Sequence, residues 1–560
     1  MRRFLFLGKV SFMRSSKAVF ILFLFIGFSL FFNGLNGEFI HDDILVLSHS
    51  FFERTDKIFS FFGQPYFEDF LQAGLYRPLT QFSFGINFLF GSSPFGFHFI
   101  NIILHIANSF LAFLFLKRLT EKHNLALITA LLFLVLPIHV EAVTSIVGRA
   151  ELLSFFFGML TLLLWFDGKY FFSAITLFLA LLSKESAVAV MAIIFLFSWY
   201  YRKKWRWLFY YFASAAIYFI LRIVVLGQYA FQTKVEFVFN PLVYVTFFER
   251  FFTALKVLVL YLVKIFVPYR LSADYSYDQI SIVANLFFSP LALAGLLILG
   301  LTFWIVFRTF QKKDTPVFTW ALILFFMPYL IISNLIFPTG TIMAERLMYF
   351  SSLGAMMILV LAIDYLFKFS RRIGLTVLLT LVSVYGLLTV NQNRIWASRE
   401  ALLTHNFEKS PNSIAAKTEF GILMLERDRE LAKRLSLEVY EKYPDYIQNL
   451  NLRAAVEVQE GNLEAAGKFL ERALELRPKH QNTLQNLSRV YFTLGKYQEA
   501  EKALNVLVAE YGGKGNVIFY ALVQAKNGRF PQSRQTLYSF FGPEIEDDSA
   551  LKILRGELDE

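Results

Sequence analysis

The stretch KAVFILFLFIGFSLFFNGLNGEFIHDD, residues 17–43, joins an apolar run at 17–33 to two adjacent acids, Asp42 and Asp43. A bilayer core needs about 20 apolar residues per helix, and fewer where the flanking side chains reach the interface. The run therefore predicts a membrane helix, with the acids close to the membrane surface. The preceding residues, 1–16, are basic, and no small-residue cleavage site follows the run. We interpret the run as an uncleaved first helix.

The composition is typical of a polytopic membrane protein. The 560 residues are 56% hydrophobic and 17% charged, with a mean hydropathy of +0.52, which is outside the usual range of soluble domains. The absence of cysteine rules out disulfides, a thiol nucleophile and cysteine metal ligands. The excess of bases behind the net charge of +11 lies in the first 410 residues, where short basic loops fit the positive-inside pattern. Nucleic acid is not an expected partner.

Further apolar runs predict about eleven spans in total. They lie near residues 96–117, 124–138, 150–166, 170–183, 186–200, 207–226, 283–307, 316–335, 346–368 and 373–390. Basic clusters at the N-terminus and at 116–122, 201–206, 307–314 and 368–372 predict the cytoplasmic side, so the loop with the acid pair is expected outside. With these assignments the loops on both sides of the run near 248–267 are expected outside, so this run cannot make one net crossing of the membrane. We expect a re-entrant, interfacial or paired helix there.

The C-terminal region is repetitive. GNLEAAGKFLERALELRP (461–478) matches GKYQEAEKALNVLVAEYG (495–512) and, more loosely, GRFPQSRQTLYSFFGP (528–543). This period of about 34 residues resembles tetratricopeptide repeats, each a helix–turn–helix unit. The expected order is a cytoplasmic N-terminus at 1–16, a membrane domain at 17–392, a linker helix region at 393–412, about four repeats at 413–547 and an acidic tail at 548–560. Crossing parity places the repeats on the side of the acid pair.

Ionisable groups at the edge of a membrane domain are costly and are therefore functional candidates. For Asp42 and Asp43 two interpretations stay open: a solvated helix-end pair or cap, and a general base on the rim of a lipid-facing cavity. His98 and His105 share a helix face with two asparagines, which favours interhelical hydrogen bonds over a zinc site. No metal site is expected.

A second polar group lies between two expected helices, in HVEAVTSIVGRAELLS (139–154). It is either a local ion-pair network or part of a phosphate site, in which arginine or lysine would hold the phosphate. The same alternatives apply to the polar residues of other outward-facing segments. The candidates, besides the acid pair, are Arg77, His139, Glu141, Arg149, Glu151, Lys184, Glu345 and Arg346. Because so many of these residues are expected on one membrane face, we favour a functional site over separate ion-pair networks.

The order of these motifs resembles a known family. FIHDD (39–43), YRPLT (76–80), PFGFHFINIILHIAN (94–108), LPIHVEAVTSIVGRAELLS (136–154), SKES (183–186), LSADYS (271–276) and AERLMYFSS (344–352) precede the repeats. This arrangement resembles the transmembrane and tetratricopeptide-repeat O-mannosyltransferases, which belong to the GT-C class of glycosyltransferases. The resemblance implies an all-α protein, a polytopic GT-C-like helix bundle followed by a tetratricopeptide-repeat α-solenoid. It also matches Asp42 and Asp43 to the family's acidic pair, one of which is taken as the catalytic base, and the eight other candidates to polar positions of its site.

The implied activity is transfer of a sugar, a mannose-like hexose, from a polyprenyl-phosphate donor to Ser or Thr of an extracytoplasmic protein, with inversion. No cofactor is required, and a divalent metal is left open. The expected partners are the bilayer, the lipid-linked sugar and an acceptor protein engaged by the repeats. The short repeat array and the lack of cysteine resemble a bacterial relative, with periplasmic repeats on an inner-membrane protein; in a eukaryote they would be lumenal, on the endoplasmic reticulum membrane. The alternatives are a lipid or polysaccharide acceptor and a non-enzymatic scaffold.

Overall fold

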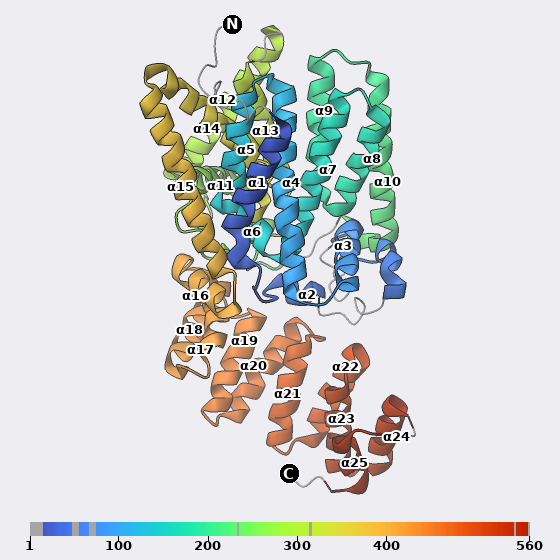
Figure 1. Ribbon diagram of the computed structural model, residues 1–560. Coiled ribbons are helices and arrows are strands. Elements are labelled where there is room, and N and C mark those ends of the chain that lie inside the picture. The colour runs from blue at the N-terminus through green and yellow to red at the C-terminus, as the bar shows by residue number, and fades with distance from the viewer. Residues whose placement is uncertain are drawn as a thin grey trace. The chain divides into compact units, whose positions relative to one another are not determined.

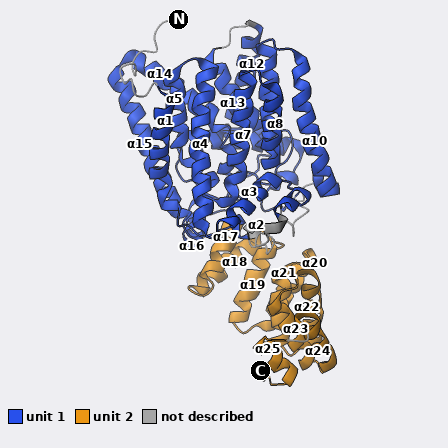
Figure 2. Ribbon diagram, turned by 45° about the vertical axis from the view of Figure 1, so that its right-hand side comes forward, with its two compact units in different colours: residues 1–413 blue, residues 414–560 orange. Residues whose placement is uncertain are grey.

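The computed structural model describes residues 15–47, 55–66, 74–231, 235–312, 316–542 and 545–557. Throughout these ranges the regular elements are helices, and no strand is present, so the expected all-α class is confirmed. The chain divides into two compact units, Met1–Ser413 and Ile414–Glu560 (Figure 2). They correspond to the apolar part of the sequence and to its repetitive part.

The first unit is a bundle of apolar helices (Figure 1). They are α1 (Ser16–Phe31), α4 (Pro94–Thr120), α5 (His123–Leu134), α7 (Arg149–Phe166), α8 (Tyr170–Ser183), α9 (Val188–Tyr200), α10 (Leu208–Leu226), α12 (Pro290–Lys312), α13 (Val317–Ile332), α14 (Ser352–Phe369) and α15 (Arg371–Ile395). Each expected span falls on one of them. Within the described ranges, seven helices are long and apolar enough to cross a membrane, or eight if the pair His123–Leu134 and Pro137–Thr144, bent by 54°, is one span. The protein is a multi-pass membrane protein.

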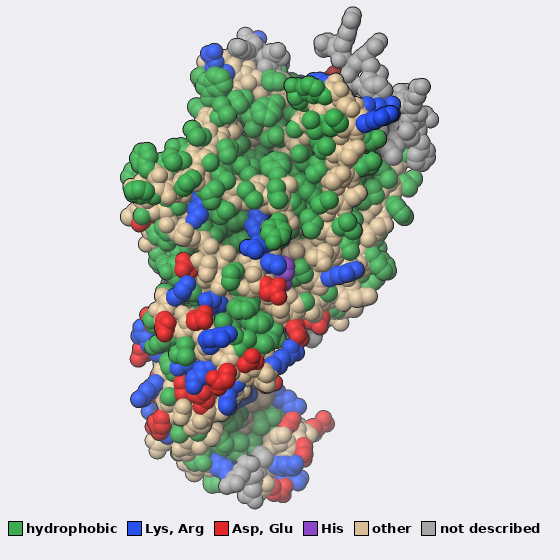
Figure 3. All heavy atoms as spheres, turned by 90° about the vertical axis from the view of Figure 1, so that its left-hand side faces the viewer, with side chains coloured by type: hydrophobic (Ala, Val, Ile, Leu, Met, Phe, Trp, Pro, Cys, Tyr) green, Lys and Arg blue, Asp and Glu red, His purple; other side chains and the backbone are tan. Residues whose placement is uncertain are grey.

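Burial differs strongly among these helices. In its most apolar window, the helix Ile146–Phe166 is 72% buried, whereas Pro290–Gln311 is only 17% buried and Arg371–Ile395 28% buried. Hydrophobic side chains cover much of the visible outer surface of the first unit (Figure 3). An apolar surface of this extent requires lipid around it, since soluble proteins rarely expose patches larger than a few hundred Å².

The segment predicted to be a re-entrant, interfacial or paired helix forms one continuous helix, α11 (Phe247–Phe266), so the paired alternative was wrong. A capping box starts it, because Thr246 Oγ1 accepts a bond from the Glu249 N–H and the Glu249 carboxylate accepts one from the Thr246 N–H. The helix is not among the candidate spans, and it carries Lys256 and Lys264 as well as Glu249 and Arg250. How it meets the membrane stays a prediction.

Short elements carry the polar motifs. They are α2 (Asp42–Leu47), η3 (Thr55–Gly63), α3 (Pro78–Leu89), η5 (Pro137–His139), α6 (Val140–Thr144), η6 (Ile146–Gly148), η7 (Glu185–Ala187) and η12 (Glu345–Met348). Of these, α2, α3 and α6 lie toward one end of the bundle (Figure 1). Gly148 lets η6 fold back on α6, since a Cβ there would lie 2.2 Å from the Ala142 carbonyl oxygen. This close approach fixes the positions of Val147 and Arg149.

The first unit ends with α16 (Arg399–Lys409), and the second is a series of helix pairs. Its helices are α17 (Ile414–Met424), α18 (Arg429–Lys442), α19 (Ile447–Gln459), α20 (Leu463–Leu476), α21 (Gln481–Thr493), α22 (Tyr497–Tyr511), α23 (Lys514–Lys526), α24 (Phe530–Phe541) and α25 (Asp548–Arg555). Gly461, Gly495 and Gly528 turn between paired helices with φ of 81°, 72° and 77°, values that favour glycine. The unit is an α-solenoid of tetratricopeptide type.

Candidate functional site

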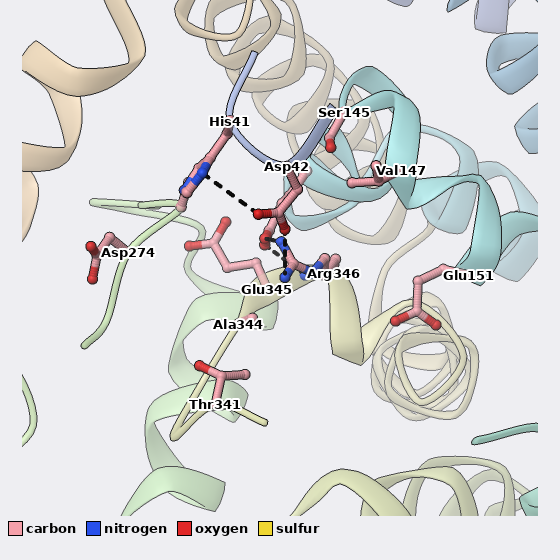
Figure 4. Close-up of polar contacts among 12 residues, drawn as sticks. His41, Asp42, Ser145, Val147, Glu151, Asp274, Thr341, Ala344, Glu345 and Arg346 are labelled. Carbon is pink, nitrogen blue, oxygen red and sulfur yellow. Dashed lines mark hydrogen bonds and ion pairs between the residues drawn. The ribbon is translucent and has the colours of Figure 1, made fainter. Parts of the chain in front are cut away.

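The two adjacent acids have different surroundings. Asp43 is fully buried, and its Oδ1 accepts the Val147 N–H at 2.9 Å, with Ser145 Oγ at 3.4 Å. These contacts hold α2 against η6. The Asp42 side chain is 32% exposed and lies 3.6 Å from Arg346 Nη2 and 3.7 Å from His41 Nδ1 (Figure 4). Asp42 is therefore accessible to a substrate, whereas Asp43 positions the segment that carries it.

Their protonation also differs. Burial raises the pKa of Asp42, but the charges of His41, Arg346 and Arg77 outweigh it and hold that pKa below the usual 3.8. Burial raises the pKa of Asp43 to about 7, although the N–H groups of Val147 and Ile40 partly oppose the increase. Asp42 is thus an ionised carboxylate at neutral pH, as a general base must be.

Asp43→Asn is expected to remove a pH dependence of stability between about pH 4 and pH 7. The folded-state pKa of Asp43, about 7, lies above its unfolded value of 3.8. This contribution to folding is therefore complete below pH ~4 and is lost as the pH rises through about 7. The melting temperature of the wild type in detergent should fall relative to that of D43N over this range. A constant difference between the two proteins would contradict the assignment.

Arg346 is held by a second, buried carboxylate. Its backbone N–H and its Nη1 donate to the two oxygens of Glu141, each at 2.8 Å. The Glu141 side chain is 1% exposed, whereas that of Arg346 is 30% exposed. A charge-assisted contact at two points fixes the guanidinium geometrically, so Glu141 sets the distance between Arg346 and Asp42.

Arg77, Glu151 and Lys184 belong to a neighbouring ion-pair group. Arg77 Nε and Nη2 donate to the Glu185 carboxylate at 3.0 and 2.6 Å, and Lys184 pairs with Glu151. The charge of Arg77 reaches Asp42, since it helps to lower the pKa of that acid. Glu185 was not predicted as a site residue. The sequence feature that could have identified Glu185 is its place in the SKES motif, directly after Lys184.

Arg149 and His139 lie inside the bundle. The fully buried guanidinium of Arg149 donates to Asn101 Oδ1 (2.8 Å), Asn87 Oδ1 (3.0 Å) and the carbonyl oxygens of Phe97 (2.9 Å) and Ser83 (3.2 Å). His139 is fully buried, with Nε2 2.7 Å from Ser352 Oγ. Neither side chain is accessible to a phosphate in this arrangement, and both support the elements that carry the accessible groups. Their assignment to the donor phosphate stays a prediction.

Arg149→Met is expected to reduce the free energy of unfolding by about 3 kcal/mol, because several buried acceptors would lose their donor. Thermal unfolding in detergent measures the change. The exposed Arg118 on α4 offers a matched control, since R118M is expected to alter stability by about 0.5 kcal/mol or less. Equal melting temperatures for the two variants would contradict a structural role of Arg149.

Glu345 lies between the site and the irregular segment 267–289. It is 3% exposed and accepts bonds from Tyr275 Oη (2.5 Å) and the Ser272 N–H (2.8 Å). Burial raises its pKa to about 8. Neither Tyr275 nor Ser272 was a predicted site residue, although both lie in the LSADYS motif. Glu345 therefore anchors this segment beside Arg346.

The same segment is bonded to the last residues of the first unit. Ser410 Oγ donates to the Asp274 carbonyl oxygen at 2.6 Å, and Ser413 Oγ donates to Asp274 Oδ1 at 3.1 Å. The Glu38 N–H donates to the Ala397 carbonyl oxygen at 3.1 Å. The chain thus leaves the first unit close to the segments that carry the site. Among the described residues, no group of three or more His, Asp or Glu is placed to hold a metal ion.

Comparisons with known proteins agree with both parts of the chain. The tetratricopeptide repeat model matches residues 457–517. Human protein O-mannosyl-transferase TMTC1 is 26% identical over 503 residues, covering 74% of this chain and 54% of the relative. Protein O-mannosyl-transferase F38B6.6 of Caenorhabditis elegans is 26% identical over 422 residues, covering 71% and 58%. The chain spans somewhat more than half the length of these relatives.

A solved structure, the APC/C hetero-tetramer Cut9–Hcn1, matches at 14% identity with a TM-score of 0.26, covering 92% of this chain and 98% of that chain; so low a score supports no statement about the fold. The sequence relatives are informative because their likeness extends far beyond the residues matched by the repeat model. The resemblance of this chain to the TMTC family of protein O-mannosyl-transferases is therefore confirmed.

Proposed function

We propose that the protein is a membrane glycosyltransferase that moves a sugar, a mannose-like hexose, from a polyprenyl-phosphate donor to Ser or Thr of an extracytoplasmic protein. The observation that carries this proposal is the accessible, ionised Asp42 held 3.6 Å from the Arg346 guanidinium. The similarity of this chain to protein O-mannosyl-transferases supports the choice of sugar and acceptor. A donor with its lipid tail in the bilayer presents its phosphosugar at the membrane surface, at the end of the bundle where α2 lies.

In the proposed step, a carboxylate oxygen of Asp42 takes the proton of the acceptor hydroxyl. The hydroxyl oxygen forms a bond to the anomeric carbon as the bond from that carbon to the phosphate oxygen breaks, and in-line attack inverts the configuration. The departing polyprenyl phosphate carries the negative charge, which Arg346 and Arg77 stabilise. A preorganised guanidinium acts well in this role because it needs no reorientation during the reaction.

We place the site and the repeats on the extracytoplasmic side: periplasmic in a bacterium, or lumenal in the endoplasmic reticulum. The bonds of Ser410 and Ser413 to Asp274 support a shared side, since the chain leaves the first unit beside the site segments. A topology reporter fused after residue 410 should give an extracytoplasmic signal. A cytoplasmic signal would overturn this placement.

The activity itself is tested with the full chain purified in detergent and a panel of radiolabelled polyprenyl-phosphate hexoses. A periplasmic or lumenal protein fraction, lipids and envelope polysaccharide serve as acceptors. Label in protein is the expected result, with a mannose donor as the best substrate. Label in lipid or polysaccharide, and not in protein, would show that the acceptor belongs to that other class. Failure of every donor would favour the non-enzymatic scaffold.

A further inference from the structure

A buried arginine on a membrane helix has no part in the reaction proposed above. Arg222 lies on α10, within the candidate span Trp205–Ala230 and shortly before the helix ends at Leu226. A charged side chain in a membrane helix is costly unless it is paired or hydrated, and such residues are therefore functional candidates. The acceptors of this guanidinium indicate what its role is.

The guanidinium connects the end of its own helix to a segment far away in the chain. Arg222 Nε donates to the carbonyl oxygen of Ala230, just beyond α10, at 2.8 Å. Its Nη2 donates to the Gly74 carbonyl oxygen at 2.5 Å, and its Nη1 donates to Tyr218 Oη at 3.3 Å. Tyr218 Oη in turn donates to the Tyr76 carbonyl oxygen at 3.4 Å. A planar fork with five N–H donors is suited to reach acceptors in several directions at once.

The segment that these bonds reach leads directly into Arg77. Residues 74–77 form neither helix nor strand, so their carbonyl groups need partners from elsewhere in the structure. Arg222 and Tyr218 supply the partners for two of the three carbonyl groups that precede Arg77, and a backbone N–H supplies the third. Two side chains of α10 therefore hold the backbone that carries Arg77.

Arg222 also acts on the partner of the Arg77 side chain. The Arg77 guanidinium donates to the Glu185 carboxylate at 3.0 and 2.6 Å. Burial raises the pKa of Glu185, but the charges of Arg77, Lys184 and Arg222 outweigh it and hold that pKa well below the usual 4.5. The hydrogen bonds of Arg222 thus hold the backbone of Arg77, and its charge helps to keep the side-chain partner of Arg77 ionised.

We infer that Arg222 is a positioning residue that clamps residues 74–77 to α10 and thereby sets the place of the Arg77 guanidinium in the site. The use of this clamp in sugar transfer rests on the proposed function, whereas the clamp itself does not. In that reaction Arg77 stabilises the departing phosphate, and a cation held in place beforehand needs no reorientation. The alternative is that Arg222 only stabilises the fold.

Hydrogen exchange followed by mass spectrometry tests the clamp without any substrate. In the full chain in detergent, Arg222→Met should raise the exchange rate of the amide hydrogens of residues 74–81 about tenfold or more, because this segment opens locally more often. The exposed Arg308 on the span α12 provides the matched control, and R308M should exchange as the wild type does. Unaltered exchange of residues 74–81 in folded R222M would overturn the inference.

A milder variant keeps the test decisive if R222M does not fold. Lysine retains the positive charge and one donor group but lacks the planar fork, so R222K cannot hold Gly74, Tyr218 and Ala230 together. Its exchange rate over residues 74–81 should lie between those of the wild type and R222M, and exchange equal to that of the wild type would overturn the inference. The melting temperature and circular dichroism establish that each variant is folded.

A double variant separates positioning from plain stabilisation. With rates of sugar transfer normalised to folded protein, R222M should lower the rate about tenfold or more when Arg77 is present, because misplacing a reacting group by about 1 Å can cost this much. In the Arg77→Met background R222M should cause at most about a twofold further loss, since no guanidinium is left to position. An equal loss in both backgrounds would overturn the positioning role.

These outcomes are separable from failure of the proposed function. Faster exchange of residues 74–81 in R222M, together with no transfer by the wild type from any donor, would reject the transferase and keep the clamp. Transfer by the wild type, with exchange and rate unaltered in R222M, would reject the clamp and keep the transferase.

Discussion

Asp42→Asn should lower the rate of sugar transfer about 100- to 10,000-fold, the usual contribution of a general base. Asparagine keeps the size and much of the hydrogen bonding of aspartate but cannot take the proton of an acceptor hydroxyl at neutral pH. The Asp42 side chain is 32% exposed, and its contacts with other described residues are the ion pairs with His41 and Arg346, so the melting temperature should change little. Initial rates with saturating donor and acceptor measure the effect.

The neighbouring acid provides the control for this variant. Asp43 is fully buried and bonded to the Val147 N–H, so Asp43→Asn should alter stability more than Asp42→Asn does. It should leave a measurable rate in the folded fraction. A D42N protein with wild-type turnover, or a D43N protein that is fully stable and inactive, would reverse the roles assigned to the two acids.

The apolar helices were predictable because each span leaves a local signal of many residues. The difference between Asp42 and Asp43 left no such signal. It depends on Val147, whose N–H is brought to Asp43 only when η6 folds back on α6 at Gly148. A sequence shows two equivalent carboxylates, and the contact that distinguishes them is 104 residues away in the chain.

The arginines illustrate the same limit. Arg149 looked like a phosphate ligand because its cationic side chain lies near the membrane surface, but its donors are occupied by Asn87, Asn101 and main-chain carbonyl groups. These acceptors come from α3 and α4, and no local pattern links them to Arg149. Arg346 was predicted with equal weight, yet its guanidinium remains 30% exposed. Charge and position in the sequence identified the members of the cluster, while tertiary contacts divided them into supporting and accessible groups.

Arg346→Met is expected to lower transfer about 100- to 1,000-fold, because the departing phosphate loses a preorganised positive charge. Two further effects follow from its contacts. The buried carboxylate of Glu141 loses its cationic partner, which should destabilise the fold by about 3 kcal/mol. The pKa of Asp42 should rise, since Arg346 lowers it in the wild type whereas burial raises it. The acid limb of the pH–rate profile, where Asp42 loses its proton, should therefore move to higher pH.

The double variant E141Q/R346M separates the catalytic role of Arg346 from its structural role. Glutamine carries no charge that needs a partner, and its Oε1 can still accept the Arg346 N–H that Glu141 accepts at 2.8 Å; that backbone group is retained in the methionine variant. We expect the melting temperature to recover toward the wild type while the rate remains low. If transfer recovers together with stability, Arg346 is only a structural partner of Glu141. If stability recovers and the rate does not, the guanidinium acts on the reaction, and Glu141 serves to hold it there.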